Sequence, residues 1–590
     1  MAEYRPPLDD IRFVLGHVVD LAGLAAFDAY AHADVETSLG LLEEAGRFMA
    51  EVVAPTNRIG DEQGSVRQPD GSVVTPDGFK EAYARYVDAG WGAVPFDPEY
   101  GGGGFPWLVA VGLQELLTSA NMAFSMAPLL TQGAIDMLSH HGSTEQKQTY
   151  LPKMLTGEWT GTMNLTEPDA GSDVGALRTK AEPGGDGTWR ITGTKIFISF
   201  GEHDMAENII HLVLARTPGA PPGTKGISCF IVRKVLADGT RNAVTCASIE
   251  HKMGIRASPT CVLEYDGATA ELIGEEHAGM RYMFTMMNNA RLSVGLEGLA
   301  LGERAMQQAA TFARERRQGR APGAAPGTSS PIIEHPDVRR MLLTMRAYVE
   351  AMRALVYVNA EAVDLSRHDP DEAARARAAE RADLLTPISK AWCTDLGVEV
   401  TSLAVQVHGG MGYVEETGVA QHYRDARIAP IYEGTNGIQA MDLVGRKLPI
   451  RAGGAVADLL EDMAALDAEL QVPELASIGA ALRDGVAALR EATDWLLAHG
   501  IAQPVDALAG ATPYLRLFGI VTGGWVLARS AVAATAALAA GTGDDGFLRD
   551  KVVTARFYAE QLLPAARGLL PAVTAGAADL FAIPEARLAP

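Results

Sequence analysis

The feature that most constrains the fold is a change of sequence texture in the middle of the chain. Between about residues 160 and 280, short apolar runs such as WRITGTKIFIS and NIIHLVLA are separated by turn-forming stretches such as GGDG and TPGAPPGTKG. Closely spaced runs of this kind predict an antiparallel β-barrel or sandwich rather than βαβ units. No GxGxxG sequence opens a helix after a strand in this region, so a Rossmann fold is not predicted.

Both flanks of this segment have helical periodicity. The N-terminal flank carries the apolar spacing of Val111, Leu113 and Leu117, and Pro128 predicts a helix break. The C-terminal flank contains long periodic runs at 294–315 and 338–366, joined by the linker GRAPGAAPGTSSP, and an Ala- and Leu-rich region follows a break at 449–454.

A chain of 590 residues is too long for one hydrophobic core. We therefore predict an α+β multidomain protein. Its expected parts are an N-terminal helical domain with an N-terminal extension (1–159), a central β-barrel or sandwich (160–280), a C-terminal helical bundle (281–445) and an additional helical domain (446–590).

Composition argues against several classes of protein. The formal charge is -23, and residues 446–590 carry 12 basic and 16 acidic side chains, which opposes binding to nucleic acid. The four cysteines have no CxxC spacing, so we expect neither a disulfide framework nor a metal site. The small number of cysteines also predicts a reducing compartment. The N-terminus does not resemble a secretory signal, and the apolar stretch 530–540 is too short to span a bilayer. We expect a cytoplasmic protein without stable membrane insertion.

Four stretches are candidates for chemistry. The glycine run 101–104 lacks the Lys-Ser/Thr pair of a phosphate loop and is interpreted as a flexible surface turn. MNLTEPDAGSDVGAL (163–177) and QVHGGMGY (406–413) each suit a ligand approaching a turn, but each stretch alone is more often a plain turn. IYEGTNGIQ (431–439) places Glu433 between an aromatic residue and a glycine, although a single Glu is most often solvated.

The order and spacing of the last three stretches, together with DPEYGGGG, KIFIS, HKMGIRASP and ARERRQG, resemble the acyl-CoA dehydrogenase family over about residues 40–445. The extra N-terminal segment and the tail after Arg446 resemble a long bacterial branch of this family, which includes 3-methylmercaptopropionyl-CoA dehydrogenases. The resemblance implies a helical domain, a β-domain and a helical bundle with FAD as cofactor, which agrees with the partition predicted from the residues.

The family pattern also implies roles for individual residues. Glu433 matches the catalytic base that removes the α-proton while hydride passes from the β-carbon to flavin N5, and Ala290 stands where some relatives carry the base instead. The residues expected to bind the cofactor are Met163, Leu165, Thr166, Phe197, Ile198, Ser199, Arg316, Gln406, Gly409, Gly410, Thr435 and Asn436. Those expected to bind the substrate are Ser172, Asn288, Arg291, Tyr432 and Gly434.

Three positions depart from the pattern. Phe197 stands where many relatives have Trp, Gly437 where several have Gln, and Asn288 where relatives have an acidic residue. Phe197 keeps an aromatic ring for stacking but lacks the indole donor, Gly437 cannot make the contact of a glutamine side chain, and Asn288 lacks the negative charge of the acidic residue.

The resemblance implies an acyl-CoA substrate, electron-transfer flavoprotein as the electron acceptor, and a homodimer or higher homo-oligomer in which Arg316 reaches a neighbouring subunit's FAD. Two alternatives remain open. One is an acyl-CoA oxidase that returns electrons to O2, and the other is a flavin-bearing, DNA-binding protein of the same superfamily. The acidic tail opposes the second alternative.

Overall fold

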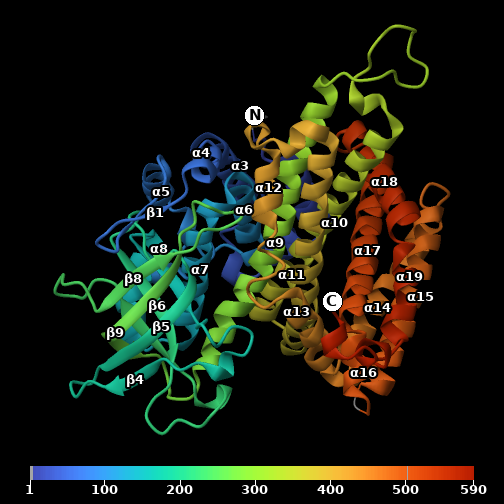
Figure 1. The fold of residues 1–590 in the computed structure, drawn as a ribbon. Coiled ribbons are helices and arrows are strands. Elements are labelled where there is room, and N and C mark those ends of the chain that lie inside the picture. Colours follow the sequence, from blue (N-terminus) through green and yellow to red (C-terminus); the bar gives the residue numbers. More distant parts are fainter. Residues whose placement is uncertain (1–3, 501, 590) are drawn as a thin grey trace. The chain divides into compact units, whose positions relative to one another are not determined.

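The computed structural model describes residues 4–500 and 502–589, which form two compact units. Residues 40–293 make up the unit that we call the β-containing unit, and residues 1–39 together with 294–590 make up the helical unit. The chain thus enters the helical unit, leaves it, and returns to it at residue 294 (Figure 1).

The helices that precede the sheet are short to medium in length. The helix α3 runs through the boundary between the units at residues 39 and 40. The helices between residue 35 and the sheet are α3 (Val35–Phe48), α4 (Thr56–Gln63), α5 (Phe79–Asp88), α6 (Trp107–Ala120), α7 (Met122–His141) and α8 (Thr144–Thr156).

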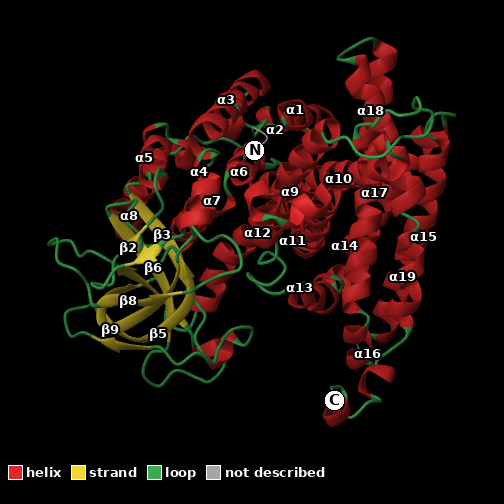
Figure 2. Ribbon diagram, turned by 45° about the horizontal axis from the view of Figure 1, so that its top comes forward, coloured by secondary structure: helices red, strands yellow, loops and turns green. Residues whose placement is uncertain are grey.

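The strands β3 to β9 form one seven-stranded sheet in the order β3-β6-β7-β9-β5-β4, with β8 paired to β9 (Figure 2). Every pair is antiparallel except β3 with β6, so the predicted antiparallel texture is correct for most of the sheet. The strands are β3 (Trp159–Asn164), β4 (Lys180–Pro183), β5 (Trp189–Ser199), β6 (Asn208–Ala215), β7 (Ser228–Arg233), β8 (Val244–Ile249) and β9 (Thr260–Leu272).

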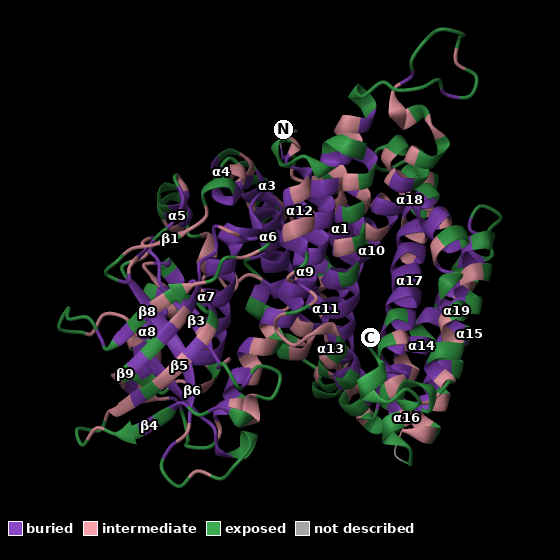
Figure 3. Ribbon diagram, in the orientation of Figure 1, coloured by how far each residue is buried: buried purple, intermediate pink, exposed green. Residues whose placement is uncertain are grey.

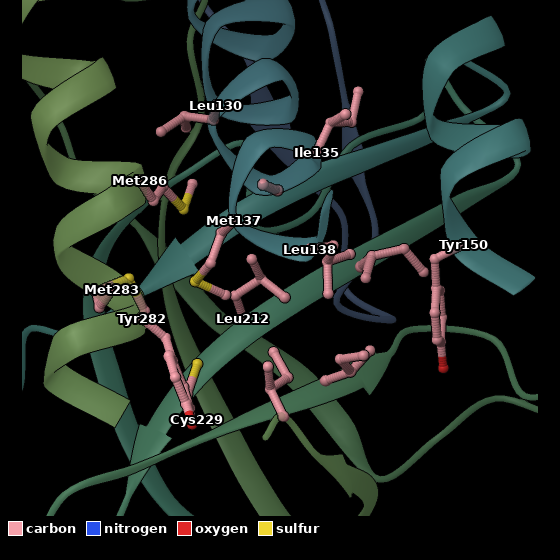
Figure 4. Packing of buried hydrophobic residues seen from close by; sticks show 14 of the residues in the cluster. Leu130, Ile135, Met137, Leu138, Tyr150, Leu212, Cys229, Tyr282, Met283 and Met286 are labelled. Atoms are coloured by element: carbon pink, nitrogen blue, oxygen red, sulfur yellow. The ribbon is translucent and has the colours of Figure 1, made fainter. Parts of the chain in front are cut away.

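The sheet and the helices of this unit share a core. Figure 4 shows Met137 and Leu138 of α7 packed toward Leu212 of β6, with Met283 and Met286 from the start of α9 (Gly279–Glu315) beside them. A Cβ atom at Gly161 in β3 would lie 2.5 Å from the Cβ of Ala134 in α7, so the glycine allows the helix to lie directly on the strand. This packing fixes where β3 ends, and its end belongs to the candidate site.

Three local predictions need correction. Pro128 does not end a helix, because it lies inside α7, and the break falls at Asn121, whose side chain caps α7 by accepting from the Phe124 N–H. Every residue from 107 to 138 is buried, so tertiary packing outweighs the local effect of the proline. The N-terminal region also contains a two-stranded ladder, β1 (Val66–Arg67) with β2 (Val73–Val74), which its helical periodicity did not indicate.

The glycine run 101–104 is a turn, as predicted, but it is tightly held rather than flexible. All four backbone N–H groups donate to carbonyl groups of residues 93–98, and a Cβ atom at Gly102 would lie 2.0 Å from the Phe96 carbonyl oxygen. No N–H group of the run is left to bind a phosphate.

The helical unit contains the longest helices. Figure 3 shows that α9 is largely buried, and in α11 the buried residues lie from Leu384 onward. The helices are α1 (Leu8–His17), α2 (Leu21–Ala25), the main part of α9, α10 (Pro336–His368), α11 (Glu372–His408), α12 (Val419–Ala426), α13 (Asn436–Asp442), α14 (Gly454–Ala465), α15 (Ala476–His499), α16 (Pro504–Ala509), α17 (Ala511–Ala540), α18 (Asp545–Phe557) and α19 (Ala565–Thr574).

Glycines bring the central helices of this unit into close contact. A Cβ atom at Gly298 in α9 would lie 2.2 Å from the Cys393 carbonyl oxygen of α11, and one at Gly519 in α17 would lie 2.3 Å from Cγ of Trp392. The C-terminal region therefore packs on α11 through α17. At its other side Lys551 of α18 is buried and forms ion pairs with Asp10 of α1 and Glu350 of α10.

The described residues contain one helix, α17, whose length and apolar composition would allow it to cross a membrane. The apolar stretch noted in the sequence at 530–540 is only its C-terminal part. In the structure 83% of its most apolar window is buried, which is the pattern of a core helix.

Candidate functional site

The predicted site residues fall into two groups, one in each unit. In the β-containing unit, the segment at the end of β3 lies beside the end of β5, because the Ile196 N–H donates to the Thr166 carbonyl at 2.9 Å. This hydrogen bond brings Met163, Leu165 and Thr166 next to the segment 197–199, which follows them about thirty residues later in the chain. The two segments form one continuous surface.

Phe197 is the most unusual side chain on this surface. Its ring is 59% exposed and its φ angle is +59°, a left-handed conformation that is costly for a bulky residue. The pairing of β5 with β9 changes register between Lys195 and Ile198, and such a bulge re-aims side chains. Ile198 is buried, so the bulge leaves Phe197 as an exposed flat ring suited to a planar aromatic ligand.

A buried ion pair supports this surface from below. Lys195 is fully buried, and its Nζ donates to the Leu165 carbonyl at 2.9 Å and to Glu167 Oε1 at 2.8 Å. Burial lowers the pKa of Lys195 to about 8, against the opposing effect of Glu167. Burial acts to raise the pKa of Glu167, but Lys195 and the N–H groups of Arg178 and Thr179 hold it below its usual value. No local sequence pattern predicts this ion pair, because its two residues lie 28 positions apart in the chain.

The predicted substrate residues of this unit are Ser172, Asn288 and Arg291. Ser172 is exposed in the loop after β3, and Asn288 is exposed on α9. Arg291, three residues further along the same helix, is 4% exposed. The structure thus places two of the three on the surface and the arginine inside.

In the helical unit, Glu433 lies in the turn between α12 and α13. Glu433 and Gly434 have φ angles of +54° and +81°, so the chain takes two successive left-handed steps here. The conformation suits Gly434, but for Glu433 it costs on the order of 1–3 kcal/mol and persists only where surrounding contacts enforce it.

The enforcing contacts come from buried side chains on α11 and α13. Lys390, fully buried, donates from Nζ to the Gly434 carbonyl at 2.9 Å. Gln439 donates from Nε2 to the carbonyls of Glu433 at 3.3 Å and Gly434 at 3.2 Å. Both carbonyl groups of the turn are therefore held, which fixes the direction in which the Glu433 side chain leaves the backbone.

Asn436 is anchored within the same unit. Its Oδ1 accepts from Lys390 at 2.9 Å, and its amide donates to Asp395 at 2.7 Å and to the Ala391 carbonyl at 3.1 Å. Thr435 caps α13 by accepting from the Ile438 N–H. The side chains of both residues thus stabilise the start of α13, and their predicted cofactor contacts stay predictions.

Glu297 is a member of this site that the sequence interpretation missed. It lies on α9, has no exposed surface, and accepts a short hydrogen bond from the hydroxyl group of Tyr432. Burial raises the pKa of Glu297 to about 8, and Glu433 adds to this rise, while the Tyr432 hydrogen bond and Lys390 act to lower it. A lone carboxylate among small apolar residues, in VGLEGLAL, was the available signal.

The glycines at the end of α11 form a second open surface in the helical unit. Gly409 has a φ angle of +61°, and neither it nor Gly410 has another atom within 4 Å of the position of an added Cβ. Gln406 is exposed one turn earlier. This bare backbone suits close approach by a phosphate-bearing ligand. Arg316 is exposed just after α9, as a contact across subunits would require.

Within residues 4–500 and 502–589, no group of three or more His, Cys, Asp or Glu side chains is placed to hold a metal ion. Each surface, taken by itself, fits one part of FAD: the exposed Phe197 ring beside Thr166 fits a planar aromatic group, and the bare backbone at Gly409 and Gly410 fits a phosphate.

Family models match almost the whole chain. The acyl-CoA dehydrogenase N-terminal, middle and C-terminal domain models match residues 36–158, 162–268 and 277–448. A further model, acetyl-CoA dehydrogenase C-terminal like, matches residues 456–584.

Individual proteins are similar over the same extent. A 3-methylmercaptopropionyl-CoA dehydrogenase of Ruegeria pomeroyi is 50% identical over 95% of this chain and 96% of its own length. A butyryl-CoA dehydrogenase of Syntrophomonas wolfei is 35% identical over 99% of this chain and 98% of its own. The crystal structure of an acyl-CoA dehydrogenase complexed with FAD from Bacillus anthracis has a TM-score of 0.73 at 21% identity, covering 95% of this chain and 91% of that one. The predicted fold class, including the additional C-terminal helical domain, is confirmed.

Proposed function

Because this chain belongs to the acyl-CoA dehydrogenase family, FAD-dependent oxidoreductases that act on acyl-CoA thioesters, we propose that Glu433 is its catalytic base. Glu433 takes the α-proton of the bound thioester, and the product is a trans-2-enoyl-CoA. FAD, when bound, supplies the acceptor for the hydride that leaves the β-carbon.

The observation that carries this proposal is the held left-handed turn at Glu433. A carboxylate of no special function has no reason to occupy a strained backbone position whose two carbonyl groups are fixed by Lys390 and Gln439. A general base must be aimed at its proton with little freedom, and this turn provides that restraint.

The remaining predicted residues take supporting roles in this proposal. By the family pattern we assign the planar part of FAD to Met163, Leu165, Thr166, Phe197, Ile198 and Ser199, its pyrophosphate to Gln406, Gly409, Gly410 and a neighbouring subunit's Arg316, and its adenylate portion to Thr435 and Asn436. Substrate would contact Ser172, Asn288, Arg291, Tyr432 and Gly434. We propose electron-transfer flavoprotein as the acceptor that reoxidises the enzyme and a homodimer as the assembly.

The test is the substitution Glu433→Gln, which removes the base but keeps the size of the side chain. The purified variant should retain yellow, bound FAD and lose flavin bleaching by acyl-CoA under anaerobic conditions by about 10²- to 10⁴-fold, the range expected for general base catalysis. Glu416→Gln, at an exposed carboxylate of the segment before α12, is the matched control and should bleach at the wild-type rate. Bleaching of Glu433→Gln at the wild-type rate refutes the assignment.

For the acyl group we propose a short chain, with 3-methylmercaptopropionyl-CoA as the first candidate, since the relative of that name is 50% identical. Values of kcat/KM with an artificial electron acceptor should be higher for 3-methylmercaptopropionyl-CoA and butyryl-CoA than for palmitoyl-CoA. A preference for palmitoyl-CoA contradicts this part of the proposal. Reoxidation by electron-transfer flavoprotein that is no faster than by air would instead favour an oxidase.

A further inference from the structure

A fully buried carboxyl group, that of Glu297, is hydrogen-bonded to the residue before the proposed base. Glu297 of α9 accepts the hydroxyl proton of Tyr432, and Tyr432 is the residue before Glu433. The turn is therefore held from three helices, by Glu297 on α9, Lys390 on α11 and Gln439 on α13. Of these, Glu297 is the one that can change its charge near neutral pH.

We propose that Glu297 keeps its proton under working conditions and is a positioning residue for the base, fixing the Tyr432 ring as a neutral carboxyl group and leaving the negative charge on Glu433. The inference rests on the proposed function of Glu433. It assigns Glu297 no contact with substrate or cofactor.

The surroundings of Glu297 favour its neutral form. The side chain is fully buried, and no donor among the described residues reaches its Oε1 atom. A carboxylate in such a place lacks the hydrogen bonds that stabilise its charge, so burial favours the protonated group. The titratable and charged groups that act on it are Tyr432 from the turn before α13, Lys390 from α11, and Glu433.

The charge of Glu433 acts in the same direction. Two neighbouring carboxyl groups do not both ionise easily, and of the two the half-buried Glu433 is better solvated than the fully buried Glu297. Burial together with Glu433 brings the pKa of Glu297 to about 8, so Glu297 is mostly neutral at pH 7 and ionises as the pH rises through 8. The part of the pH-rate profile in which the rate falls at low pH, its acid limb, then depends on Glu433 with a neutral Glu297 beside it.

The decisive experiment is the pH dependence of the anaerobic flavin reduction rate in the FAD-loaded enzyme and in Glu297→Gln. Glutamine is neutral and still accepts the Tyr432 hydroxyl proton. We expect Glu297→Gln to react within about threefold of the wild type at pH 7, to keep the acid limb in place, and to lose a transition that the wild type shows near pH 8. If Glu297 is ionised at pH 7, removing its charge moves the acid limb to lower pH, and this result overturns the proposal.

The positioning role is tested separately by removing the hydrogen bond. Glu297→Leu and Tyr432→Phe should each slow flavin reduction by roughly five- to tenfold, the effect of one hydrogen bond, and the double variant should be no slower than either single one. Thermal unfolding and the visible FAD spectrum show whether the variants are folded. Additive losses, or no loss in either single variant, contradict the role. Full activity of Glu433→Gln would refute the proposed base instead, whatever the Glu297 variants do.

Discussion

The substitution Lys390→Met tests whether the strained turn at Glu433 depends on the buried ammonium group. Methionine is apolar and of similar length, so it fills the space of the lysine stem and removes the charge. The Gly434 carbonyl and Asn436 Oδ1 each lose a hydrogen bond of 2.9 Å from a charged donor. The Gly434 carbonyl keeps Gln439 at 3.2 Å, and Asn436 Oδ1 keeps the Thr394 hydroxyl at 3.3 Å.

The size of the effect follows from these contacts. Hydrogen bonds to charged groups contribute about 1.5–3 kcal/mol each, but removing a buried ammonium group also removes its desolvation penalty, and neither acceptor is left without a donor. We therefore expect a net loss of about 2–3 kcal/mol in the free energy of unfolding. The Gly434 carbonyl loses the shorter of its two side-chain hydrogen bonds, so Glu433 relaxes toward an unstrained conformation, and flavin reduction by acyl-CoA should slow by roughly ten- to a hundredfold.

Lys551→Met is the matched control. Lys551 is also buried in the helical unit, but its ion pairs are with Asp10 and Glu350 on α1 and α10. Removing it breaks the ion pair of Asp10 with Lys551, while Glu350 keeps Arg346 at 2.8 Å. The substitution should cost about 3–5 kcal/mol, more than Lys390→Met. Measured by denaturant unfolding and anaerobic stopped-flow, the two variants should rank in opposite order for stability and for activity. Wild-type flavin reduction in folded Lys390→Met refutes the argument.

Two further substitutions test the supports of the fold. Lys195→Met leaves the buried carboxylate of Glu167 without its ion pair, so it should destabilise the protein by about 3–5 kcal/mol and lower FAD retention. Adding Glu167→Gln should recover part of the loss in both measurements. No recovery contradicts the ion-pair explanation. Gly519→Leu inserts a side chain where Trp392 leaves no space, so it should lower the free energy of unfolding by at least about 1–3 kcal/mol and expose the C-terminal region to proteolysis. Gly568→Leu is the control and should have neither effect, because no atom lies within 4 Å of an added Cβ there.

The sequence was sufficient for the order of helical and β-rich regions, because periodicity and turn residues are local signals. Glu433 and the two segments that meet at Thr166 were singled out by their match to the family pattern, since composition alone does not distinguish them from ordinary turns and strands. The sequence interpretation was wrong about Pro128 and gave no sign of the β1–β2 ladder, because burial of α7 outweighs a proline, and two-residue strands carry no periodicity.

The buried charged groups escaped prediction for a different reason. Glu297 and Tyr432 are 135 residues apart, and Lys390 lies 44 residues before the carbonyl that it binds. A charged side chain within an apolar helix shows only that a partner must exist, because an unpaired buried charge is too costly. The identity of that partner is set by the crossing of α9 and α11, which depends on close backbone contact at Gly298.

Local sequence and tertiary contacts both contribute to the conformation of Glu433. The stretch IYEGTNGIQ supplies Gly434, which takes the left-handed conformation without strain, but no residue of the stretch before Gln439 makes that conformation favourable for Glu433 itself. The isolated segment would relax, since a strained non-glycine residue persists only where tertiary contacts over-determine it. Lys390 and Glu297 supply those contacts from helices that the motif does not contain. The motif therefore contains the proposed base, and the buried polar groups of α9 and α11 hold the backbone turn that carries it.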